Sequence, residues 1–511
     1  MKNTIKSSKK DDLELFYIGQ IDENFIFKNY KELLENSKNF LENLKSAFCF
    51  VLKLGDDEYF AARSLFNPAE IFYYFDGKKI SFNFSQDELL KSIKKELDLS
   101  ALSEYLSFCR SHKSFFKNVF FCEAGSFLHY KNKQLKIEVF DDLKGLCANF
   151  LSKEEIEQKI LNTLSFEIKQ NLHKNPACLL SGGLDSSVLC ALFQKTKKQK
   201  ITAFNLGFKD ALHYDESAFA RLSADFIGCD LQRVNITRND FISEFESLFD
   251  YACEPLADSA TLALKFLSKK IKEFGYECAF SAEGSDECFL GYDLYFRVLE
   301  FYKYDIPPAK YPQISKDSEY LRRKAKNLPI YGGFCEVFTA FQKELLFKNS
   351  PQFTLFEPIK KYENSYENFS QMRFMDLKIA SNSTILKKLS MMDIELFTPF
   401  LSLAKFALKI PNPSPNNEPK ELLKNLAKKQ KLLPNEIIFR KKKGLSTPFL
   451  EWILKDCSAS KEILKCNEIL NFTLFDEDFV FKLEQKARRG RFKQHLWTLL
   501  VFSKWLQRHF G

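Results

Sequence analysis

At positions 177–187 the chain reads Ala177-Cys178-Leu179-Leu180-Ser181-Gly182-Gly183-Leu184-Asp185-Ser186-Ser187. The apolar start of this run predicts a buried parallel strand, and residues 188–194 predict the opening of a helix, so the glycines lie in a strand-to-helix turn. Backbone amides in such a turn point outward, the helix N-terminus adds partial positive charge, and glycines let a phosphate approach closely. The run therefore predicts an anion-binding site.

The side chains of this turn narrow the choice of anion. Ser181, Ser186 and Ser187 add hydroxyl donors, whereas Asp185 would repel a bare phosphate and is tolerable only with a cation between them. The implied ligand is a pyrophosphate that chelates Mg²⁺. The turn is not a Walker loop, because no Gly-Lys-Ser/Thr follows the glycines, and it is not the G-x-G-x-x-G dinucleotide pattern.

Composition indicates a large globular protein. The 511 residues are 45% hydrophobic and 28% charged, which suggests about two to four domains by length. The net charge of +9 is spread through Lys-rich helices, and this argues against a general nucleic-acid binder. The 13 cysteines are scattered without CxxC pairs, as expected of reduced core thiols. With no long apolar stretch and no apolar leader, we expect a cytoplasmic protein without a membrane segment.

The first part of the chain has short apolar runs separated by helical pieces. Residues 1–12 are polar and predict a disordered tail. Strands are predicted around 16–18, 47–52, 71–75 and 126–130, and helices over 30–44, 86–97 and 100–109. This pattern predicts an α+β domain with antiparallel sheets.

The second part alternates strands and helices. Ser152 and Glu155 predict a capping box at the start of a helix that ends near residue 172. Strands are predicted over 201–208, 231–236 and 278–280, which favours a parallel, doubly wound sheet with its ligand at the carboxyl ends of the strands. The last of these strands ends in an acidic loop, so Asp286 on this loop and Asp185 can grip Mg²⁺ together. Residues 293–440 predict mainly amphipathic helices.

Three stretches resemble known motifs. Residues 181–187 resemble the S-G-G-x-D-S-S pyrophosphate loop of the ATP-pyrophosphatases, enzymes that cleave ATP to AMP and pyrophosphate. Residues 281–292 resemble the S-G-E-G-x-D-E-x-F-G-G-Y signature of asparagine synthetases, and residues 433–448 resemble that family's L-P-x-x-I-x-x-R-x-K-x-G-F-S-x-P. The resemblance extends over nearly the whole chain and is weakest over 13–140.

The resemblance implies an α/β protein of two domains. Residues 13–145 would form a degenerate N-terminal nucleophile hydrolase-like (Ntn-like) α+β sandwich, similar to a type 2 glutamine amidotransferase domain. Residues 150–511 would form an ATP-pyrophosphatase domain of the adenine nucleotide alpha hydrolase-like type, with extra C-terminal helices. In that family the glutaminase nucleophile is a cysteine directly after the initiator methionine, but here Lys2 follows Met1 and the first cysteine is Cys49. We therefore expect no glutamine hydrolysis by this chain and a scaffold role for its first domain.

The resemblance also implies an activity and its residues. A carboxylate would be activated by ATP and Mg²⁺ as an acyl-adenylate, and ammonia or another amine would then displace AMP. Glu283 would orient the amine or accept its proton, and Lys442 would neutralise charge on the α-phosphate and on the tetrahedral intermediate. Metal binding would fall to Asp185 and Asp286. The expected nucleotide-binding residues are Leu180, Ser181, Gly182, Gly183, Asp185, Ser186, Ser187, Leu206, Ser281 and Ala282, with the backbone of Leu206 against adenine.

Several alternatives stay open. Residues 386–402 resemble the family's D-R-x-S-M-x-x-x-L-E-x-R-x-P-F-L-D but have Leu386-Lys387, Phe397 and Ser402 in place of D-R, the second Arg and the last Asp. The carboxylate is therefore aspartate, an analogue, a sugar acid or a specialised metabolite. The amine is free ammonia, ammonia from a separate glutaminase subunit, or an amine on the substrate itself, as in β-lactam synthetases. Those relatives carry a tyrosine where this chain has Glu283, which favours the intermolecular reaction.

Two further hypotheses concern the quaternary structure of the protein and a loss of catalysis. A homodimer is compatible with the sequence. A hypothesis of another class is a nucleotide-binding scaffold that has lost catalysis. The joint presence of Asp185, Asp286, Glu283 and Lys442 argues against it, because carboxylates beside a phosphate site are costly unless a metal and a reaction use them.

Overall fold

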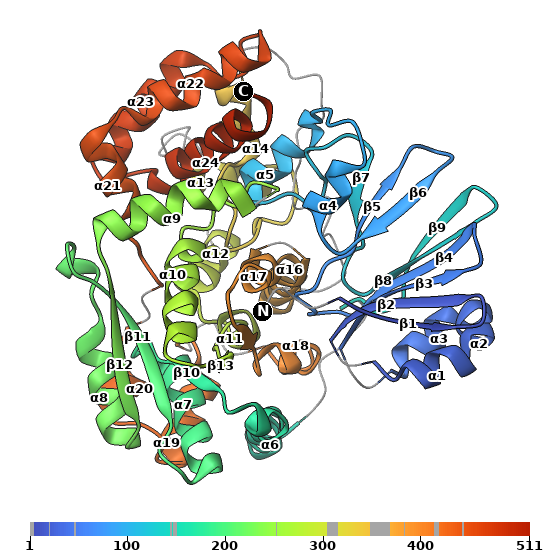
Figure 1. Cartoon of the computed structure of the whole chain (residues 1–511). Helices are drawn as coiled ribbons and strands as arrows, with labels where there is room; N and C mark the ends of the chain where they lie inside the picture. Colours follow the sequence, from blue (N-terminus) through green and yellow to red (C-terminus); the bar gives the residue numbers. More distant parts are fainter. Residues whose placement is uncertain are drawn as a thin grey trace.

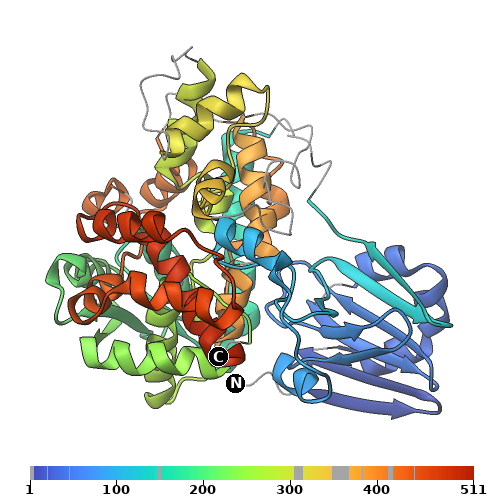
Figure 2. The same ribbon diagram turned by 90° about the horizontal axis from the view of Figure 1, so that it is seen from above.

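The computed structural model describes residues 5–19, 21–44, 47–143, 146, 151–251, 253–303, 315–347, 368–382, 384–412, 418–441 and 444–511. It is a mixed α/β structure, as the sequence predicts. Two antiparallel sheets from the N-terminal part stand beside a parallel sheet and its many helices (Figures 1 and 2). Within the described parts of the chain, none of the helices is both long and apolar enough to cross a lipid bilayer.

The N-terminal part contains two antiparallel sheets. The larger sheet has the order β1 (Lys6–Lys10), β2 (Leu13–Gly19), β3 (Phe48–Leu54), β4 (Glu58–Arg63), β8 (Ser126–Lys131) and β9 (Gln134–Val139). The smaller has the order β6 (Ile80–Asn83), β5 (Phe72–Phe75) and β7 (Val119–Phe121). Helices α1 (Glu23–Lys28), α2 (Tyr30–Glu35) and α3 (Ser37–Glu42) pack on one face of the larger sheet, whose other face packs against the smaller sheet. The predicted α+β arrangement with antiparallel sheets is therefore confirmed.

The prediction of a disordered tail over residues 1–12 is wrong for residues 6–10. These residues form β1, which pairs antiparallel with β2, and Asp11 takes a left-handed conformation (φ 53°) in the turn. Backbone hydrogen bonds to β2 do not depend on apolar side chains, and lysines and serines suit an exposed edge strand. Polar composition therefore indicated exposure here, and not a lack of structure.

Helices α4 (Gln86–Lys91) and α5 (Leu102–Phe108) connect the two parts of the molecule. All seven residues of α5 are buried. Its Leu102, Tyr105 and Leu106 share a core with residues of α24 (Lys493–Phe510), and the Tyr105 hydroxyl donates to the Thr498 carbonyl at 2.8 Å. A segment early in the chain thus completes the core around its last helix.

The parallel sheet has the order β12 (Asp230–Ile236), β11 (Thr202–Phe208), β10 (Ala177–Leu179), β13 (Cys278–Phe280) and β14 (Glu395–Phe397). Helices α6 (Lys153–Asn171), α7 (Leu184–Lys197) and α8 (Ser217–Ile227) share one core with this sheet, and α9 (Arg238–Tyr251) and α10 (Ala260–Glu273) share the other. The sheet is therefore covered on both faces. The order of strands along the chain reverses between β10 and β13, and ligands bind at such a point in sheets of this kind.

The capping box that the sequence predicts at the start of α6 is confirmed. The Glu155 amide donates to the Ser152 hydroxyl at 3.2 Å, and the Ser152 amide donates to the Glu155 carboxylate at 2.8 Å, which completes the predicted capping box. Strand β14, which the sequence did not predict, is only three residues long and lies at the edge of the sheet.

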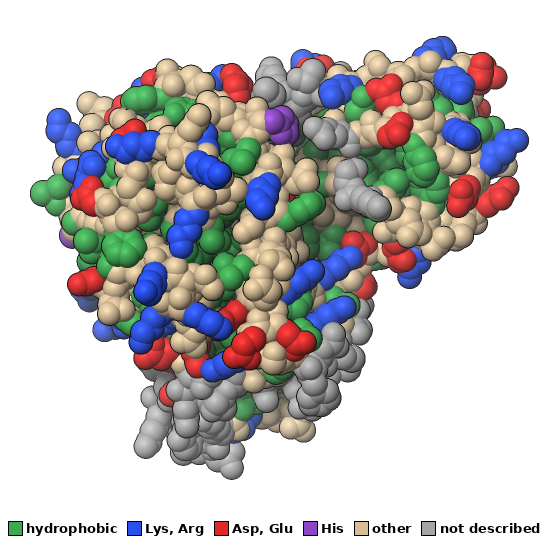
Figure 3. Space-filling view, turned by 90° about the horizontal axis from the view of Figure 1, so that it is seen from below, with side chains coloured by type: hydrophobic (Ala, Val, Ile, Leu, Met, Phe, Trp, Pro, Cys, Tyr) green, Lys and Arg blue, Asp and Glu red, His purple; other side chains and the backbone are tan. Residues whose placement is uncertain are grey.

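The remaining helices surround this sheet and build the rest of the larger part (Figure 1). They are α11 (Ser285–Phe289), α12 (Asp293–Lys303), α13 (Lys316–Ala325), α14 (Ala340–Leu346), α16 (Asn368–Asn382), α17 (Thr384–Ser390), α18 (Ala404–Ala407), α19 (Glu421–Lys429), α20 (Asn435–Ile438), α21 (Phe449–Asp456), α22 (Ala459–Leu470) and α23 (Glu477–Arg488). On the face shown in Figure 3, lysines and arginines are interspersed with acidic side chains. This agrees with the spread of charge along the sequence.

Candidate active site

The loop after β10 is held in a defined shape by its own hydroxyls. The Ser181 amide donates to the Ser186 hydroxyl at 3.1 Å, and the two hydroxyl oxygens lie 2.9 Å apart. Gly182 has a φ of 77°, and a Cβ at this position would lie 2.4 Å from the Ala220 amide nitrogen of α8. Glycine is therefore required here by both the backbone conformation and the close approach of α8.

Arg440 ties this loop to α8. Its guanidinium donates to the Gly182 carbonyl at 3.1 Å, forms an ion pair with Glu216, and lies 3.8 Å above the ring of Phe219. The sequence placed Arg440 in a family-like motif but did not show this contact. The guanidinium thereby joins a C-terminal loop to the glycine-rich turn.

The loop after β13 lies beside the first loop. Gly284 has a φ of 88°, and a Cβ there would lie 2.4 Å from a methyl carbon of Leu401. The Ser285 hydroxyl donates to the Asp185 carboxylate at 2.9 Å, which connects the two loops directly. Both loops leave the carboxyl ends of adjacent strands, at the reversal point of the sheet.

The carboxylates of Asp185 and Asp286 both pair with one cationic side chain, that of Lys420. The Lys420 ammonium forms ion pairs with both carboxylates, at 2.5 Å to Asp286 Oδ1, and Lys420 is only 4% exposed. Oxygen ligands of this kind fit Mg²⁺, which proteins usually hold through one or two carboxylates together with substrate phosphates. Among the described residues, no group of three or more His, Cys, Asp or Glu side chains could hold a metal ion. The predicted metal pair is thus brought together.

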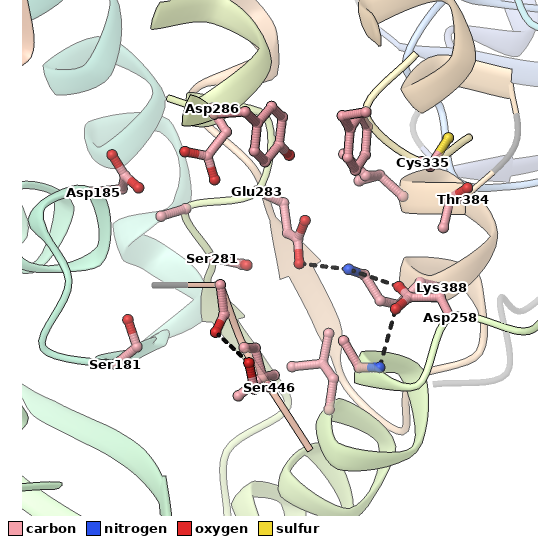
Figure 4. A pocket seen from close by; sticks show the side chains of 18 of the residues that line it. Ser181, Asp185, Asp258, Ser281, Glu283, Asp286, Cys335, Thr384, Lys388 and Ser446 are labelled. Atoms are coloured by element: carbon pink, nitrogen blue, oxygen red, sulfur yellow. Dashed lines mark hydrogen bonds and ion pairs between the residues drawn. The ribbon is translucent and has the colours of Figure 1, made fainter. Parts of the chain in front are cut away.

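Glu283 belongs to a second charged cluster. Its carboxylate lies 2.8 Å from the Lys388 ammonium, which also lies 3.4 Å from Asp258 (Figure 4). Burial lowers the pKa of Lys388, but the carboxylates of Glu283 and Asp258 outweigh burial, so its pKa lies above the usual range. Sequence reasoning missed Lys388 as the partner of Glu283. The only signal was a pair of lysines in an otherwise apolar helical segment.

Glu287 is buried next to the predicted metal pair. Its side chain accepts a hydrogen bond from the Tyr292 hydroxyl at 2.6 Å. Burial and the neighbouring Asp286 raise the pKa of Glu287 to about 8, so its neutral form is favoured at pH 7. The hydrogen bond with Tyr292 thus holds Glu287 within the loop.

One pocket of about 820 Å³ joins the two clusters. Its apolar end is formed by side chains of β11 and α10: Phe204, Leu206, Phe208, Leu264 and Leu267. Its other end contains Glu283, Lys388, Asp258, Thr384 and Cys335 (Figure 4). The lining of the pocket thus includes an apolar compartment and a charged compartment.

Most of the predicted site residues line this pocket. Those that do are Leu180, Ser181, Asp185, Ser186, Leu206, Ser281, Ala282, Glu283 and Asp286. Gly183 lines a neighbouring pocket of about 240 Å³, whereas Gly182 and Ser187 line neither of the two. The Ser187 hydroxyl donates to Ser223 at 3.0 Å inside the core. Lys442 lies outside the described residues.

The positions where residues 386–402 depart from the family pattern lie away from the pocket. Phe397 packs against Phe280 within the sheet, with tilted rings and 5.5 Å between their centroids, and Ser402 is exposed. Leu386 and Lys387 do not line the pocket either, whereas their neighbours Thr384, Ile385 and Lys388 do. The departures therefore fall largely on supporting positions.

The fold and the site define a mixed α/β protein with a glycine-rich strand-to-helix loop and two converging carboxylates at the reversal point of a parallel sheet. Residues 173–507 match the family described as asparagine synthase. The chain belongs to this family.

Individual relatives cover different shares of the chain. An asparagine synthetase [glutamine-hydrolyzing] 1 of Bacillus subtilis is 25% identical over 94% of this chain and 79% of its own length. A putative asparagine synthetase [glutamine-hydrolyzing] of Mycobacterium bovis is 23% identical over 91% of this chain and 77% of its own length. The chain is also similar to the amidase chry2 of Gibberella zeae, which is 24% identical over 66% of this chain and 53% of its own length.

Proposed function

We propose that this protein is an ATP-dependent, AMP-forming amide synthetase. The observation that carries the proposal is the convergence of Asp185 and Asp286 on one cation beside the glycine-rich loop, in the same pocket as Glu283. A phosphate loop, a pair of metal-binding oxygens and a separate proton acceptor are the parts that acyl-adenylate chemistry requires.

The N-terminal sheets support a degenerate Ntn-like domain over residues 13–145. The order of the parallel strands supports an ATP-pyrophosphatase domain over residues 150–511.

In the first step, a carboxylate oxygen of the substrate attacks the α-phosphorus of ATP, and the bond to pyrophosphate breaks. Ser181, Ser186 and the amides of the 181–187 loop bind the pyrophosphate. Adenine occupies the apolar compartment beside Leu206, with Leu180, Ser281 and Ala282 along its path. Asp185 and Asp286 would hold Mg²⁺ in place of their ion pairs with Lys420, and the metal would offset the negative charge of the phosphates.

In the second step, the amine nitrogen attacks the acyl carbon, and AMP leaves with the bridging oxygen. The amine loses a proton, for which Glu283 is the acceptor. The ion pair with Lys388 fixes where the Glu283 carboxylate lies. Lys442 supplies positive charge to the α-phosphate and the tetrahedral intermediate.

For the substrates we propose aspartate and ammonia. Aspartate is favoured over sugar acids and specialised carboxylates because the altered residues at 386, 387, 397 and 402 do not line the pocket. Ammonia, free or supplied by a separate glutaminase subunit, is favoured over glutamine. Cys49 offers no nucleophile, because it is fully buried in β3 and burial raises the pKa of its thiol.

The test is release of AMP and pyrophosphate from ATP and Mg²⁺, with aspartate and either ammonium or glutamine. We expect asparagine with ammonium and none with glutamine. Absence of AMP with aspartate under both conditions would reject aspartate, and ATP–pyrophosphate exchange with other carboxylates would follow.

A variant distinguishes an enzyme from an inactive scaffold. Lys442→Ala should abolish turnover and leave ATP binding largely intact, with the neighbouring Lys441→Ala as the matched control. If Lys442→Ala turns over like the unmodified protein, the proposed role of Lys442 is wrong. Absence of pyrophosphate release with every carboxylate, despite ATP binding, would favour the scaffold.

A further inference from the structure

The cluster of Asp258, Lys388 and Glu283 is assembled from three separate elements. Glu283 follows β13, Lys388 lies on α17, and Asp258 lies on the loop before α10. Lys388 is 6% exposed, so its ammonium depends on the two carboxylates for neutralisation. The geometry of the cluster therefore depends on where α17 and the loop carrying Asp258 are held.

Glu70 of the N-terminal part holds α17. It lies between β4 and β5, is 5% exposed, forms an ion pair with Arg110, and lies 2.8 Å from the Lys387 ammonium. Burial raises the pKa of Glu70, but the charges of Arg110 and Lys387 outweigh burial and hold it well below the usual range. Lys387 is the residue directly before Lys388. Lys387 thus binds the N-terminal part, and the adjacent Lys388 binds the active-site cluster.

Residues 86–115 hold the loop that carries Asp258. Glu254 on this loop is 4% exposed and accepts hydrogen bonds from the Gln86 side-chain amide at 2.6 Å, the Ser114 hydroxyl at 2.5 Å and the Phe115 amide at 3.1 Å. The Ala257 amide donates to the Cys109 carbonyl at 2.8 Å. Every one of these partners belongs to the N-terminal part of the chain.

We propose that the N-terminal part is a positioning element for the amide-forming site. Its Glu70 fixes α17 through Lys387, and its Gln86 and Ser114 fix the Asp258 loop through Glu254, so that Asp258, Lys388 and Glu283 meet. This inference rests on the proposed function. It gives the first domain a role in catalysis even though that domain hydrolyses no glutamine. Glu70 and Gln86 are positioning residues, because neither lines the pocket.

The test compares Glu70→Gln with Glu58→Gln, a carboxylate of the same part whose hydrogen bond with His129 and ion pair with Lys131 lie on the larger sheet, away from α17. In Glu70→Gln, we expect the KM for aspartate or ammonium to rise and kcat to fall, so that kcat/KM falls roughly tenfold. A displacement of about 1 Å in a reacting group can cost about a hundredfold, and a smaller displacement is expected here. The KM for MgATP should change less than twofold, since the phosphate loop has no contact with Glu70. Glu58→Gln should match the unmodified protein in each quantity.

Amide hydrogen exchange gives a readout that does not depend on turnover. Exchange of residues 384–390 should be faster in Glu70→Gln and unchanged in Glu58→Gln. Gln86→Leu keeps the side-chain volume but removes the hydrogen-bond donor to Glu254, so it should speed amide exchange of residues 254–259. This variant replaces Glu70→Gln in the test if Glu70→Gln does not fold. In a double-mutant cycle, the effects of Glu70→Gln and Lys387→Gln on exchange of residues 384–390 should be less than additive, because part of each effect comes from the contact that the two residues share, while Glu70→Gln also removes the ion pair with Arg110.

The inference is overturned if Glu70→Gln and Gln86→Leu show the exchange and kinetics of the unmodified protein. It is also overturned if the KM for MgATP rises as much as that for aspartate, since that pattern indicates a general loss of structure. An unmodified protein that makes no AMP with aspartate rejects the proposed substrate instead, and hydrogen exchange alone then decides the inference.

Discussion

Gly182 has less room for a side chain than Gly183, the other glycine of the phosphate loop. We predict that Gly182→Ala destabilises the protein by about 3 kcal/mol, because the new methyl would overlap the backbone of α8 as well as strain a positive φ. Gly228→Ala is the control: its φ is 78°, but nothing lies within 4 Å of a Cβ there, so only about 1 kcal/mol of conformational strain is expected. Urea unfolding of both variants measures the difference, and equal losses would contradict the crowding argument.

Lys420 supplies the cation between Asp185 and Asp286. In Lys420→Met, two neighbouring carboxylates lose their counter-charge, which should cost about 3 kcal/mol. Added Mg²⁺ should therefore raise the unfolding temperature of Lys420→Met more than that of the unmodified protein. Lys429→Met, on the following helix, removes a half-exposed ion pair with Glu157 and should show no such Mg²⁺ response. Identical Mg²⁺ responses in both variants would count against the metal pair.

At the scale of single residues, the sequence located the two loops because their chemistry is local. A glycine that must adopt positive φ, a serine beside it and an aspartate at the helix start are all readable within one short run. Lys420 and Lys388 were not found, because their function comes from partners distant in the chain and single lysines are common throughout this sequence. The inward direction of Ser187 was also hidden, since adjacent serines differ only in the face of α7 that they occupy.

Helix α8 and the phosphate loop behave as one unit through Arg440. We predict that Arg440→Gln raises the KM for ATP roughly tenfold, because it removes a charged donor to Gly182 and the ion pair with Glu216. Arg233→Gln is the control, since Arg233 pairs with Asp215, the neighbour of Glu216, but has no contact with the loop. Steady-state kinetics at varied ATP gives the comparison. An unchanged KM in Arg440→Gln would show that the loop keeps its shape without this contact.

At the scale of elements, strands and helices with clear apolar periodicity were predictable, as was the capping box of α6. Among the strands that were not predicted, β1 and β14 have no such signal. β1 is polar and β14 is very short, so each exists because a neighbouring strand offers backbone partners. Pairing of this kind is a tertiary effect that one segment of sequence does not contain.

For the whole molecule, buried carboxyls set the pH dependence of stability. Asp376 is fully buried, and burial raises its pKa to about 7, although Tyr295, Tyr331 and the Phe334 amide donate hydrogen bonds to it. A carboxyl with a raised pKa binds its proton more tightly when folded, so its contribution is present at acid pH and is lost as pH rises from about 4 to 7.

We therefore predict that Asp376→Asn weakens the fall in stability between pH 4 and 7, by up to about 4 kcal/mol. Urea unfolding midpoints across this range provide the measurement. The exposed Asp225→Asn should leave the pH profile unchanged. If Asp376→Asn has the profile of the unmodified protein, Asp376 does not titrate as its surroundings indicate.

The two-part arrangement was predictable from the change in apolar pattern along the chain, but the embedding of α5 was not. A short apolar helix carries no information about which core it joins. Its companions lie near the other end of the sequence.

This embedding has a consequence for synthesis on the ribosome. Helix α5 leaves the exit tunnel early, yet Thr498 and Phe502, which contact its Tyr105, are made almost four hundred residues later. At about 5–20 residues per second, the apolar face of α5 stays without its final partners for tens of seconds. The apolar face of α5 must therefore be kept from aggregating throughout elongation. We expect the requirement for chaperones to depend on the time that the ribosome needs to synthesise α24.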